Sequence, residues 1–344
     1  MPARPRAGYP APGGAGKLAG SLPLHPPAFS VHAPLQQRLE DFRQQGRVQA
    51  GSLIITVFGD AVLPRGSRIW LGSLIRLLEG LELNERLIRT SVFRLVKEEW
   101  LRTEPSGRCT DYLLTATGQR RFEEAARHIY AASAPQWDRR WRLIIPVGEL
   151  AQKEREALRR ALFWQGFGTL AGDCFVHPGA DLGSAFDALI AEGLGDVLGR
   201  LKPLIAADAR FGNAATDLDM VHGAWDLEGL ARTYQAFVER YAPILEQLRT
   251  DAPGGLEGED AFLLRILLIH DYRRLLLRDP ELPDVLLPAD WPGHQARLLC
   301  KEIYRRLLAP SERHLDQHFQ LANGQTPPAG ALLGERFREV DPLG

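Results

Sequence analysis

Residues 84–97 constrain the fold of this chain more than any other segment. Asn84 can cap a helix, because its side-chain oxygen can accept from a free amide of the first turn. At helical spacing, one side of the segment carries Ile88, Val92, Leu95 and Glu99, of which three are apolar. The opposite side carries Arg86, Arg89, Thr90, Arg94 and Lys97. The pattern predicts a helix with one buried side and one cationic side, which suits a negatively charged groove.

The residues before this helix predict two further helices. The nearer one is marked by a stripe of leucines, Leu74, Leu77, Leu78 and Leu81. The tight link at residues 82–83 that follows it is typical of a helix-turn-helix. Farther upstream, residues 53–58 keep helical spacing, with Ser52 as the expected cap and residues 64–66 as the expected stop. That run is rich in β-branched residues, so a strand is the alternative.

A β-hairpin is expected after the cationic helix. Residues 100–103 and 112–114 read as two short strands, and residues 105–108 between them have the composition of a turn. Three helices followed by a hairpin predict a winged helix over residues 51–115. The hairpin adds two basic side chains, Arg102 and Arg108. We therefore expect DNA contacts from the cationic helix face and from this wing.

Two interpretations without DNA remain open for this module. A basic helix face is most often a solvated surface, and winged helices also serve as protein-interaction modules. Acidic residues almost balance the basic ones over residues 51–115, so the positive charge is confined to one face. The whole chain has a formal net charge of −1, so any affinity for nucleic acid depends on this local patch.

Length and composition favour a multidomain cytoplasmic protein. The 344 residues suffice for two or three domains. Cys109, Cys174 and Cys300 lie far apart without a Cys-x-x-Cys pair, so we expect neither a structural metal site nor a disulfide framework. The sequence contains no recognisable catalytic motif or cofactor-binding loop, and no apolar run long enough for a membrane span. Residues 1–50, which begin rich in Pro, Gly and Ala, are expected to form a disordered or extended arm.

The rest of the chain completes a predicted α+β fold. After a connecting helix and linker at residues 116–135, residues 136–212 show the order strand, helix, two strands, helix, strand, which is ferredoxin-like. Residues 224–318 read as a helical domain and residues 319–344 as a flexible tail. His314 and His318 lie one helical turn apart, but no third metal ligand is indicated, so we interpret them as part of a surface helix.

Several long strings carry a family resemblance. Residues 53–66 read LIITVFGDAVLPRG, residues 69–75 read IWLGSLI and residues 83–95 read LNERLIRTSVFRL. Far downstream, residues 270–274 read HDYRR and residues 286–293 read LLPADWPG, with Asp279-Pro280 between them. Over about residues 50–318 the sequence thus resembles the PaaX family, transcriptional repressors of phenylacetic acid catabolism. The N-terminal extension and the C-terminal tail do not match the family.

The resemblance implies a repressor that binds a double-stranded DNA operator as a homodimer. In the family, the middle domain resembles the fold of small CRISPR-associated endoribonucleases. Nuclease chemistry would need metal-binding carboxylates, yet no Asp follows the first strand here, where the sequence reads Pro146-Val147-Gly148-Glu149. A fold does not carry a function by itself, so we expect a spacer or dimerisation domain.

The resemblance also implies an acyl-CoA effector, phenylacetyl-CoA in particular. Such an effector needs an apolar pocket for its acyl group and cations for its phosphates. The candidate cations of the helical domain are Arg265, Arg273, Arg274 and Arg278, which cluster near apolar helix faces. The alternative is an ordinary solvated helix face with ion pairs to Asp271, Asp279 and Glu281.

Two classes of function follow. The leading hypothesis is a ligand-responsive repressor that is not an enzyme. The alternative is an enzyme that acts on acyl-CoA or RNA and uses the winged helix as an interaction module. Operator binding that depends on the arginine helix would favour the first, and turnover that survives loss of this helix would favour the second.

Overall fold

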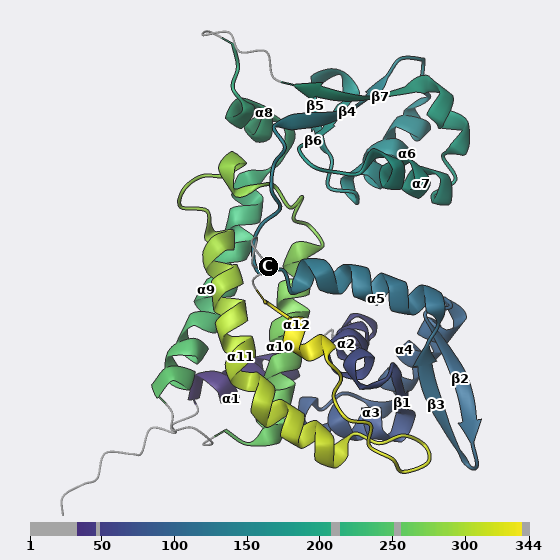
Figure 1. Ribbon diagram of the computed structural model, residues 1–344, viewed down its shortest axis with the longest axis vertical. Coiled ribbons are helices and arrows are strands. Elements are labelled where there is room, and N and C mark those ends of the chain that lie inside the picture. The colour runs from purple at the N-terminus through teal and green to yellow at the C-terminus, as the bar shows by residue number, and fades with distance from the viewer. Residues whose placement is uncertain (1–32, 46–48, 208–213, 251–255, 339–344) are drawn as a thin grey trace, which may run out of the picture.

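The computed structural model describes residues 33–45, 49–207, 214–250 and 256–338. They form two bodies, one above the other in Figure 1. The lower body holds the winged helix and the C-terminal helices, which share one hydrophobic core. The upper body holds the middle domain, which has a core of its own between its sheet and its helices. The fold is α+β, as the sequence predicts.

The winged helix begins with α2 (Ala50–Val57), which continues through a π-helical turn (η1, Phe58–Val62) and a 3-10 turn (η2, Leu63–Arg65). The chain then turns at Gly66, whose φ of 86° lies in the left-handed region that glycine tolerates. The predicted helix and its stop are confirmed, and the strand alternative is wrong. The predicted cap is also wrong, because Gln49 precedes the helix while the Ser52 hydroxyl accepts from Arg273 at 2.6 Å.

The helix-turn-helix follows as predicted. After β1 (Arg68–Trp70) come α3 (Leu71–Leu77), a 3-10 turn (η3, Glu79–Leu81) and α4 (Glu85–Lys97). All four leucines of the predicted stripe are buried. The Asn84 side chain accepts from the amide of Arg86 at 2.8 Å, so the predicted cap of α4 is confirmed. The apolar side of α4 packs on α2, while Glu99 lies beyond the helix and is exposed.

The wing is a hairpin of β2 (Leu101–Ser106) and β3 (Cys109–Leu114), paired antiparallel along its whole length. Its tight turn is Gly107-Arg108, where Gly107 has a φ of 61°. β1 pairs with the other edge of β3, which gives a three-stranded sheet in the order β1-β3-β2. The sequence analysis misses β1, because three residues are too few to show an alternating pattern.

The helix α5 (Ala116–Ile129) leads from the wing to the middle domain. That domain contains β4 (Arg140–Pro146), α6 (Gln152–Phe163), β5 (Gly168–Leu170), η4 (Ala171–Asp173), β6 (Cys174–His177), α7 (Leu182–Ala191), η5 (Gly195–Arg200) and β7 (Leu201–Ala207). Its four strands are antiparallel in the order β5-β6-β4-β7. This is the ferredoxin-like arrangement that the sequence predicts.

The C-terminal region consists of helices, the longest of which pack against one another. They are α8 (Asp217–Ala224), α9 (Leu227–Thr250), α10 (Gly258–Leu276), the 3-10 turn η6 (Asp284–Leu286), α11 (Pro292–His318) and α12 (Leu332–Glu335). Every residue from 261 to 270 in α10 is buried, because α11, α9 and the winged helix cover it. Within the described segments, no helix has both the length and the apolar character of a membrane span.

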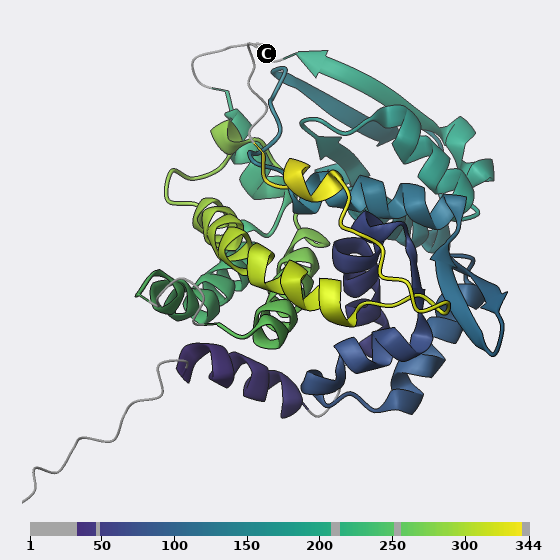
Figure 2. The same cartoon turned by 60° about the horizontal axis from the view of Figure 1, so that its bottom comes forward.

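Two expectations about the chain ends are wrong where the structure describes them. Residues 33–43 of the expected arm form α1 (Ala33–Arg43), which packs on α9 and α10 and buries Leu35, Leu39 and Phe42. Residues 319–338 of the expected flexible tail cross the lower body, with Phe319 and Phe337 fully buried (Figure 2). Both segments place apolar side chains in a core that their own composition does not reveal. Residues 1–32, 46–48 and 339–344 of these expectations lie outside the described residues.

Asp60, in the π-helical turn, joins four other parts of the lower body. Its Oδ1 accepts from Tyr130 after α5 (2.6 Å), Tyr304 of α11 (3.0 Å) and Arg336 after α12 (2.8 Å). Its Oδ2 accepts from Arg265 of α10 (2.7 Å). Burial acts to raise the pKa of Asp60, but the charges of Arg265 and Arg336 outweigh it and hold the pKa below its ordinary value. We call these five side chains the Asp60 hub.

Replacing Arg336 by Met should lower the free energy of unfolding by about 3–5 kcal/mol, because a buried carboxylate loses one of its two cations. The measurement is urea denaturation, with Arg338→Met at an exposed neighbouring position as the control. Because the pKa of Asp60 is lowered by folding, its stabilisation is present above about pH 4 and lost as the pH falls through the lowered pKa. Equal midpoints for the two variants would show that the Asp60 hub does not hold this body together.

Candidate functional site

The exposed side of α4 carries the cationic residues that the sequence analysis selects. Arg86, Arg89, Thr90, Arg94 and Lys97 are all exposed. On the opposite side, Ile88, Val92 and Leu95 are buried, which fixes the rotation of the helix about its axis. The packing of the helix therefore decides which side chains are available to a ligand.

Two of these arginines are paired within α4. Arg89 lies 2.5 Å from Glu85, and Arg94 lies 3.6 Å from Glu98. Such exposed pairs contribute at most about 1 kcal/mol, so a phosphate or a base edge can displace them. Arg94 also lies against the first turn of α2, where a Cβ at Gly51 would clash with its guanidinium. Glycine at this position therefore lets the arginine lie close to the backbone of α2.

Phe93 lies in the middle of the exposed face, and 58% of it is exposed. It comes seven residues after Arg86 and four before Lys97, so the three side chains share one stripe of the helix. Because its side chain is mostly exposed, Phe93 does not pack on another domain of the described chain and is available to a ligand.

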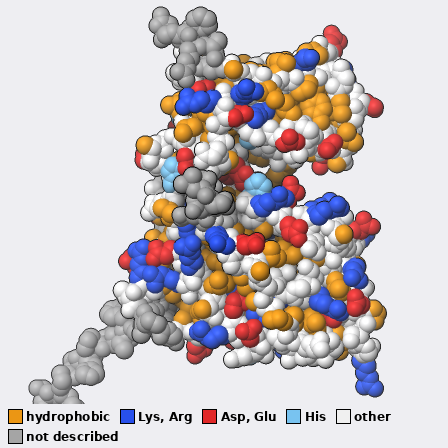
Figure 3. All heavy atoms as spheres, in the orientation of Figure 1, with side chains coloured by type: hydrophobic (Ala, Val, Ile, Leu, Met, Phe, Trp, Pro, Cys, Tyr) orange, Lys and Arg blue, Asp and Glu red, His pale blue; other side chains and the backbone are white. Residues whose placement is uncertain are grey.

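The wing presents two further cations. Arg108 is exposed at the turn, and Figure 3 shows basic side-chain atoms projecting at the tip of the wing. Arg102 is exposed on β2 but lies 3.5 Å from Glu104. Arg68 of β1 also lies near Glu104 and is hydrogen-bonded to Asp111 at 2.8 Å. The charge of Arg108 is therefore the least compensated of these three.

The four arginines predicted to bind an effector do not form one site. Arg265 is fully buried in the Asp60 hub and also pairs with Glu312 at 2.6 Å. Arg273 donates to the Ser52 hydroxyl and carbonyl in α2. Arg274 and Arg278 are exposed beside a hollow of about 290 Å³. The predicted cluster is wrong, because α10 is covered on several sides and turns about 100° per residue.

The hollow beside Arg274 and Arg278 has a third guanidinium that the sequence analysis misses. Arg240 of α9 lines it together with the apolar side chains of Phe237 and Leu275. Asp271 also lines the hollow, 3.3 Å from Arg240 and 2.9 Å from Arg38 of α1. The arrangement offers positive charge above an apolar floor, which suits an anionic ligand with an apolar part.

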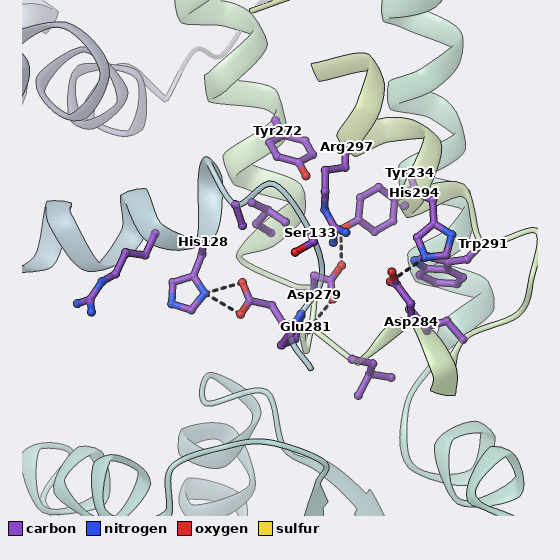
Figure 4. Close-up of a pocket in the computed structure, with 17 residues that line it drawn as sticks. His128, Ser133, Tyr234, Tyr272, Asp279, Glu281, Asp284, Trp291, His294 and Arg297 are labelled. Carbon is purple, nitrogen blue, oxygen red and sulfur yellow. Dashed lines mark hydrogen bonds and ion pairs between the residues drawn. The ribbon is translucent and has the colours of Figure 1, made fainter. Parts of the chain in front are cut away.

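A second cavity, of about 220 Å³, lies where α5 ends (Figure 4). Its aromatic walls are Tyr234, Tyr272 and Trp291. At its edge His128 lies 2.6 Å from Glu281, and this hydrogen bond raises the pKa of His128. The sequence analysis misses the cavity, because α5, α9, α10, α11 and the loop before α11 each contribute only a few residues.

Within the described residues, no group of three or more His, Cys, Asp or Glu side chains is placed to hold a metal ion. The rings of His314 and His318 stack at 4.3 Å, and His318 Nδ1 is hydrogen-bonded to the carbonyl of His314 at 3.0 Å. These two histidines form part of α11, as the sequence analysis expects of a helix.

Comparison with known proteins assigns all three domains. Residues 49–118 match the PaaX-like protein family, residues 134–195 the PaaX protein central Cas2-like domain and residues 225–317 the PaaX-like protein C-terminal domain. The chain is 36% identical over 293 residues to the transcriptional repressor PaaX of Escherichia coli strain K12, covering 84% of this chain and 90% of that protein. A solved structure, the uncharacterized protein Rv0674 from Mycobacterium tuberculosis, is similar with a TM-score of 0.48 and 24% identity, covering 76% of this chain and 98% of that one.

The relative from Escherichia coli is a transcriptional repressor, in line with the leading hypothesis of the sequence analysis. Identity at this level across most of both chains, together with matches in all three domains, shows the family. This chain belongs to the PaaX family and is a PaaX-like transcriptional repressor.

Proposed function

We propose that this protein represses genes of phenylacetate catabolism in the cytoplasm by binding double-stranded operator DNA, and that an aryl-acyl-CoA such as phenylacetyl-CoA releases it. The observation that carries the DNA-binding part is the exposed cationic face of α4 beside a projecting wing. The repressor activity of the relative supports the same function. The pathway is proposed on the resemblance to the family.

In this proposal α4 enters the major groove, which is wide enough for one helix. Base reading falls to Arg86, Arg89, Thr90 and Arg94, because arginine can form two parallel hydrogen bonds with guanine. Lys97, Arg102 and Arg108 contact phosphates, which add affinity without sequence preference. The net charge of the chain is −1, so this surface has to supply the attraction to DNA.

We further propose that the repressor binds its operator as a homodimer. Two copies of α4 related by a twofold axis would read the two halves of a palindromic site. Large apolar side chains are exposed on the middle domain, Phe163, Trp164 and Ile190. Hydrophobic atoms also gather on the upper body in Figure 3. These surfaces support a role of the middle domain in dimerisation.

For the effector, we propose that Arg274 and Arg278, together with Arg240, bind the phosphates of CoA. Guanidinium groups form strong, charge-assisted hydrogen bonds with phosphate oxygens. The apolar floor of the hollow, Phe237 and Leu275, suits the less polar part of the ligand. Arg265 and Arg273 are not part of the proposed site. Arg265 is buried in the Asp60 hub, and Arg273 is hydrogen-bonded to Ser52 of α2.

Arg89→Ala should weaken operator binding by about 1–3 kcal/mol more than binding to an unrelated duplex, because a bidentate arginine discriminates between bases. Gel-shift titrations measure both affinities, using DNA from upstream of the gene, with and without phenylacetyl-CoA. Arg232→Ala is the matched control, because Arg232 is also exposed and pairs with a glutamate four residues earlier. Equal losses on the two duplexes would mean that Arg89 reads no base. No operator binding by the wild type would refute the function itself.

Arg108→Ala should reduce affinity for all duplexes alike and lower the slope of log affinity against log salt by about 0.9, the contribution of one phosphate contact. Fluorescence anisotropy over a salt series measures this slope. Arg232→Ala again serves as the control and should keep the wild-type slope. An unchanged slope in Arg108→Ala would place the tip of the wing away from the DNA backbone.

Phe93 should contact the 5-methyl group of a thymine, since it is the apolar side chain at the centre of the base-reading face. Replacing thymines of the operator by uracil, one at a time, should then cost about fourfold in affinity at one or two positions, the value of one buried methyl group. Phe93→Ala should lose this sensitivity, whereas Leu87→Ala, on the flank of α4, should keep it. If no single uracil changes the affinity of the wild type, Phe93 does not read a methyl group.

A further inference from the structure

The cavity at the end of α5 lies between α5, which leads back to the winged helix, and the C-terminal helices. The same helices carry the hollow lined by Arg240, Arg274 and Arg278, which we call the arginine hollow. Arg127 and His128 of the last turn of α5, followed by Ala131, Ser133 and Pro135, form one side of the cavity. The other side comes from α9, α10, α11 and the loop before α11. Any molecule in this cavity would therefore contact the connecting helix and the C-terminal helices together (Figure 4).

The walls of the cavity are aromatic. Tyr234 and Trp291 meet edge to face with their ring centres 6.0 Å apart. Tyr272 and the leucines Leu276 and Leu282 add further apolar surface. A flat aromatic ring fits such walls well, because aromatic rings favour offset and edge-to-face contacts at centre distances of about 4.5–7 Å. The walls therefore favour an aromatic ligand over a straight aliphatic chain.

Two guanidinium groups line the cavity, those of Arg127 and Arg297. Arg297 points inward between Tyr272 and Tyr234 (Figure 4). Of the three acids, Glu281 pairs with His128 and Asp284 with His294. Asp279 accepts from the Tyr234 hydroxyl and from the amide of Glu281. Arg297 can thus donate a hydrogen bond to a carbonyl oxygen of a ligand. The nearby acids would repel a ligand that carries a carboxylate of its own.

Two of the downstream strings that resemble the PaaX family meet in this cavity. The string at residues 270–274 contributes Tyr272, and the string at residues 286–293 contributes Leu287, Trp291 and Gly293. Asp279, from the dipeptide between them, also lines the cavity. These residues are far apart in the chain, so their meeting at one cavity is a property of the fold that the strings themselves do not reveal.

We infer that this cavity binds the aromatic ring and carbonyl group of an aryl-acyl thioester, with Arg297 donating to the carbonyl oxygen. The inference rests on the proposed function and adds to it the site of the acyl group. The neutral thioester is favoured over the free aryl acid, because Asp279 and Glu281 would face the added charge. The aromatic ring is the part of the ligand that the cavity selects.

The size of the cavity agrees with a fragment of the ligand. About 220 Å³ is less than the roughly 300–1,000 Å³ of pockets that enclose drug-sized molecules, so the CoA part must lie outside. The arginine hollow is lined by the same helices, with Asp271, Arg274 and Leu275 of α10 alternating with Tyr272 and Leu276 of the cavity. The two sites thus lie on different faces of α10.

Occupation of the cavity would act on α5 directly. The His128–Glu281 contact closes one edge of the cavity, and α5 packs on both η1 and α10. A ligand that moves His128 would move the helix that leads back to the wing. A ligand can shift a conformation only by contacts that differ between two states, and here the differing contacts are those with α5.

The test fills the cavity from its exposed side. Ser133 is exposed and lines the cavity, so Ser133→Trp should occupy the space of the aromatic ring without disturbing the core. Gln136→Trp, exposed in the same segment and outside the cavity, is the matched control. Calorimetry with phenylacetyl-CoA should show about tenfold or more weaker binding to Ser133→Trp and unchanged binding to the control. Operator binding without ligand should be the same in all three proteins, which shows that they are folded.

Other ligands and variants separate the inference from the proposed function. Acetyl-CoA and free phenylacetate should each bind at least about tenfold more weakly than phenylacetyl-CoA. Arg297→Met should weaken the binding of phenylacetyl-CoA, because the donor to its carbonyl oxygen is lost. Unchanged binding of phenylacetyl-CoA to Ser133→Trp would overturn this site while leaving the effector in place. Equal binding of phenylacetate and its thioester would overturn the preference for the neutral form. No binding of phenylacetyl-CoA to the wild type would overturn the proposed effector as well.

Discussion

A carboxylate that is fully removed from water must be surrounded by cations and hydrogen-bond donors, and Asp60 meets this requirement with side chains from four other segments. This requirement determines how the winged helix is oriented relative to the C-terminal helices. The hub links η1 with the end of α5, with α10 and α11, and with the segment after α12. Apolar packing of α2 on α10 stabilises the same contact between the winged helix and the C-terminal helices. This packing depends less on direction than the hydrogen bonds and ion pairs of the hub do. The orientation of α4 relative to the C-terminal helices therefore follows from a few buried polar atoms.

This rigidity limits where a signal can enter. The winged helix and the C-terminal helices share one core, so they cannot rotate against each other without exposing apolar surface and Asp60. The end of α5 is different. Tyr130 is hydrogen-bonded to Asp60, while the next few residues line a cavity. A ligand at that point would act on a helix that connects the wing, the Asp60 hub and the middle domain. The proposed regulation through α5 thus rests on specific contacts.

Regular patterns in the sequence predict the elements well, whereas contacts between distant segments do not follow from them. The rotation of α4 can be predicted because Ile88, Val92 and Leu95 have helical spacing and Asn84 is a strong cap. The ferredoxin-like order follows from similar local signals. The short β1 has no such signal, and the buried tail is invisible because its apolar residues, Phe319 and Phe337, are isolated in a polar segment. The arginines of α10 show the limit most clearly, since Arg265 and Arg274 look alike in the sequence but lie in the core and at the surface.

The bond between Asp60 and Arg336 joins residues 276 positions apart, and this separation has a consequence for synthesis. Domains of a multidomain chain generally fold as they leave the ribosome, the N-terminal one first. Here the winged helix cannot complete its interior until residue 336 has been translated, because both cations of Asp60, Arg265 and Arg336, come from far downstream. Competence to bind DNA would therefore appear only after the C-terminal helices have been made.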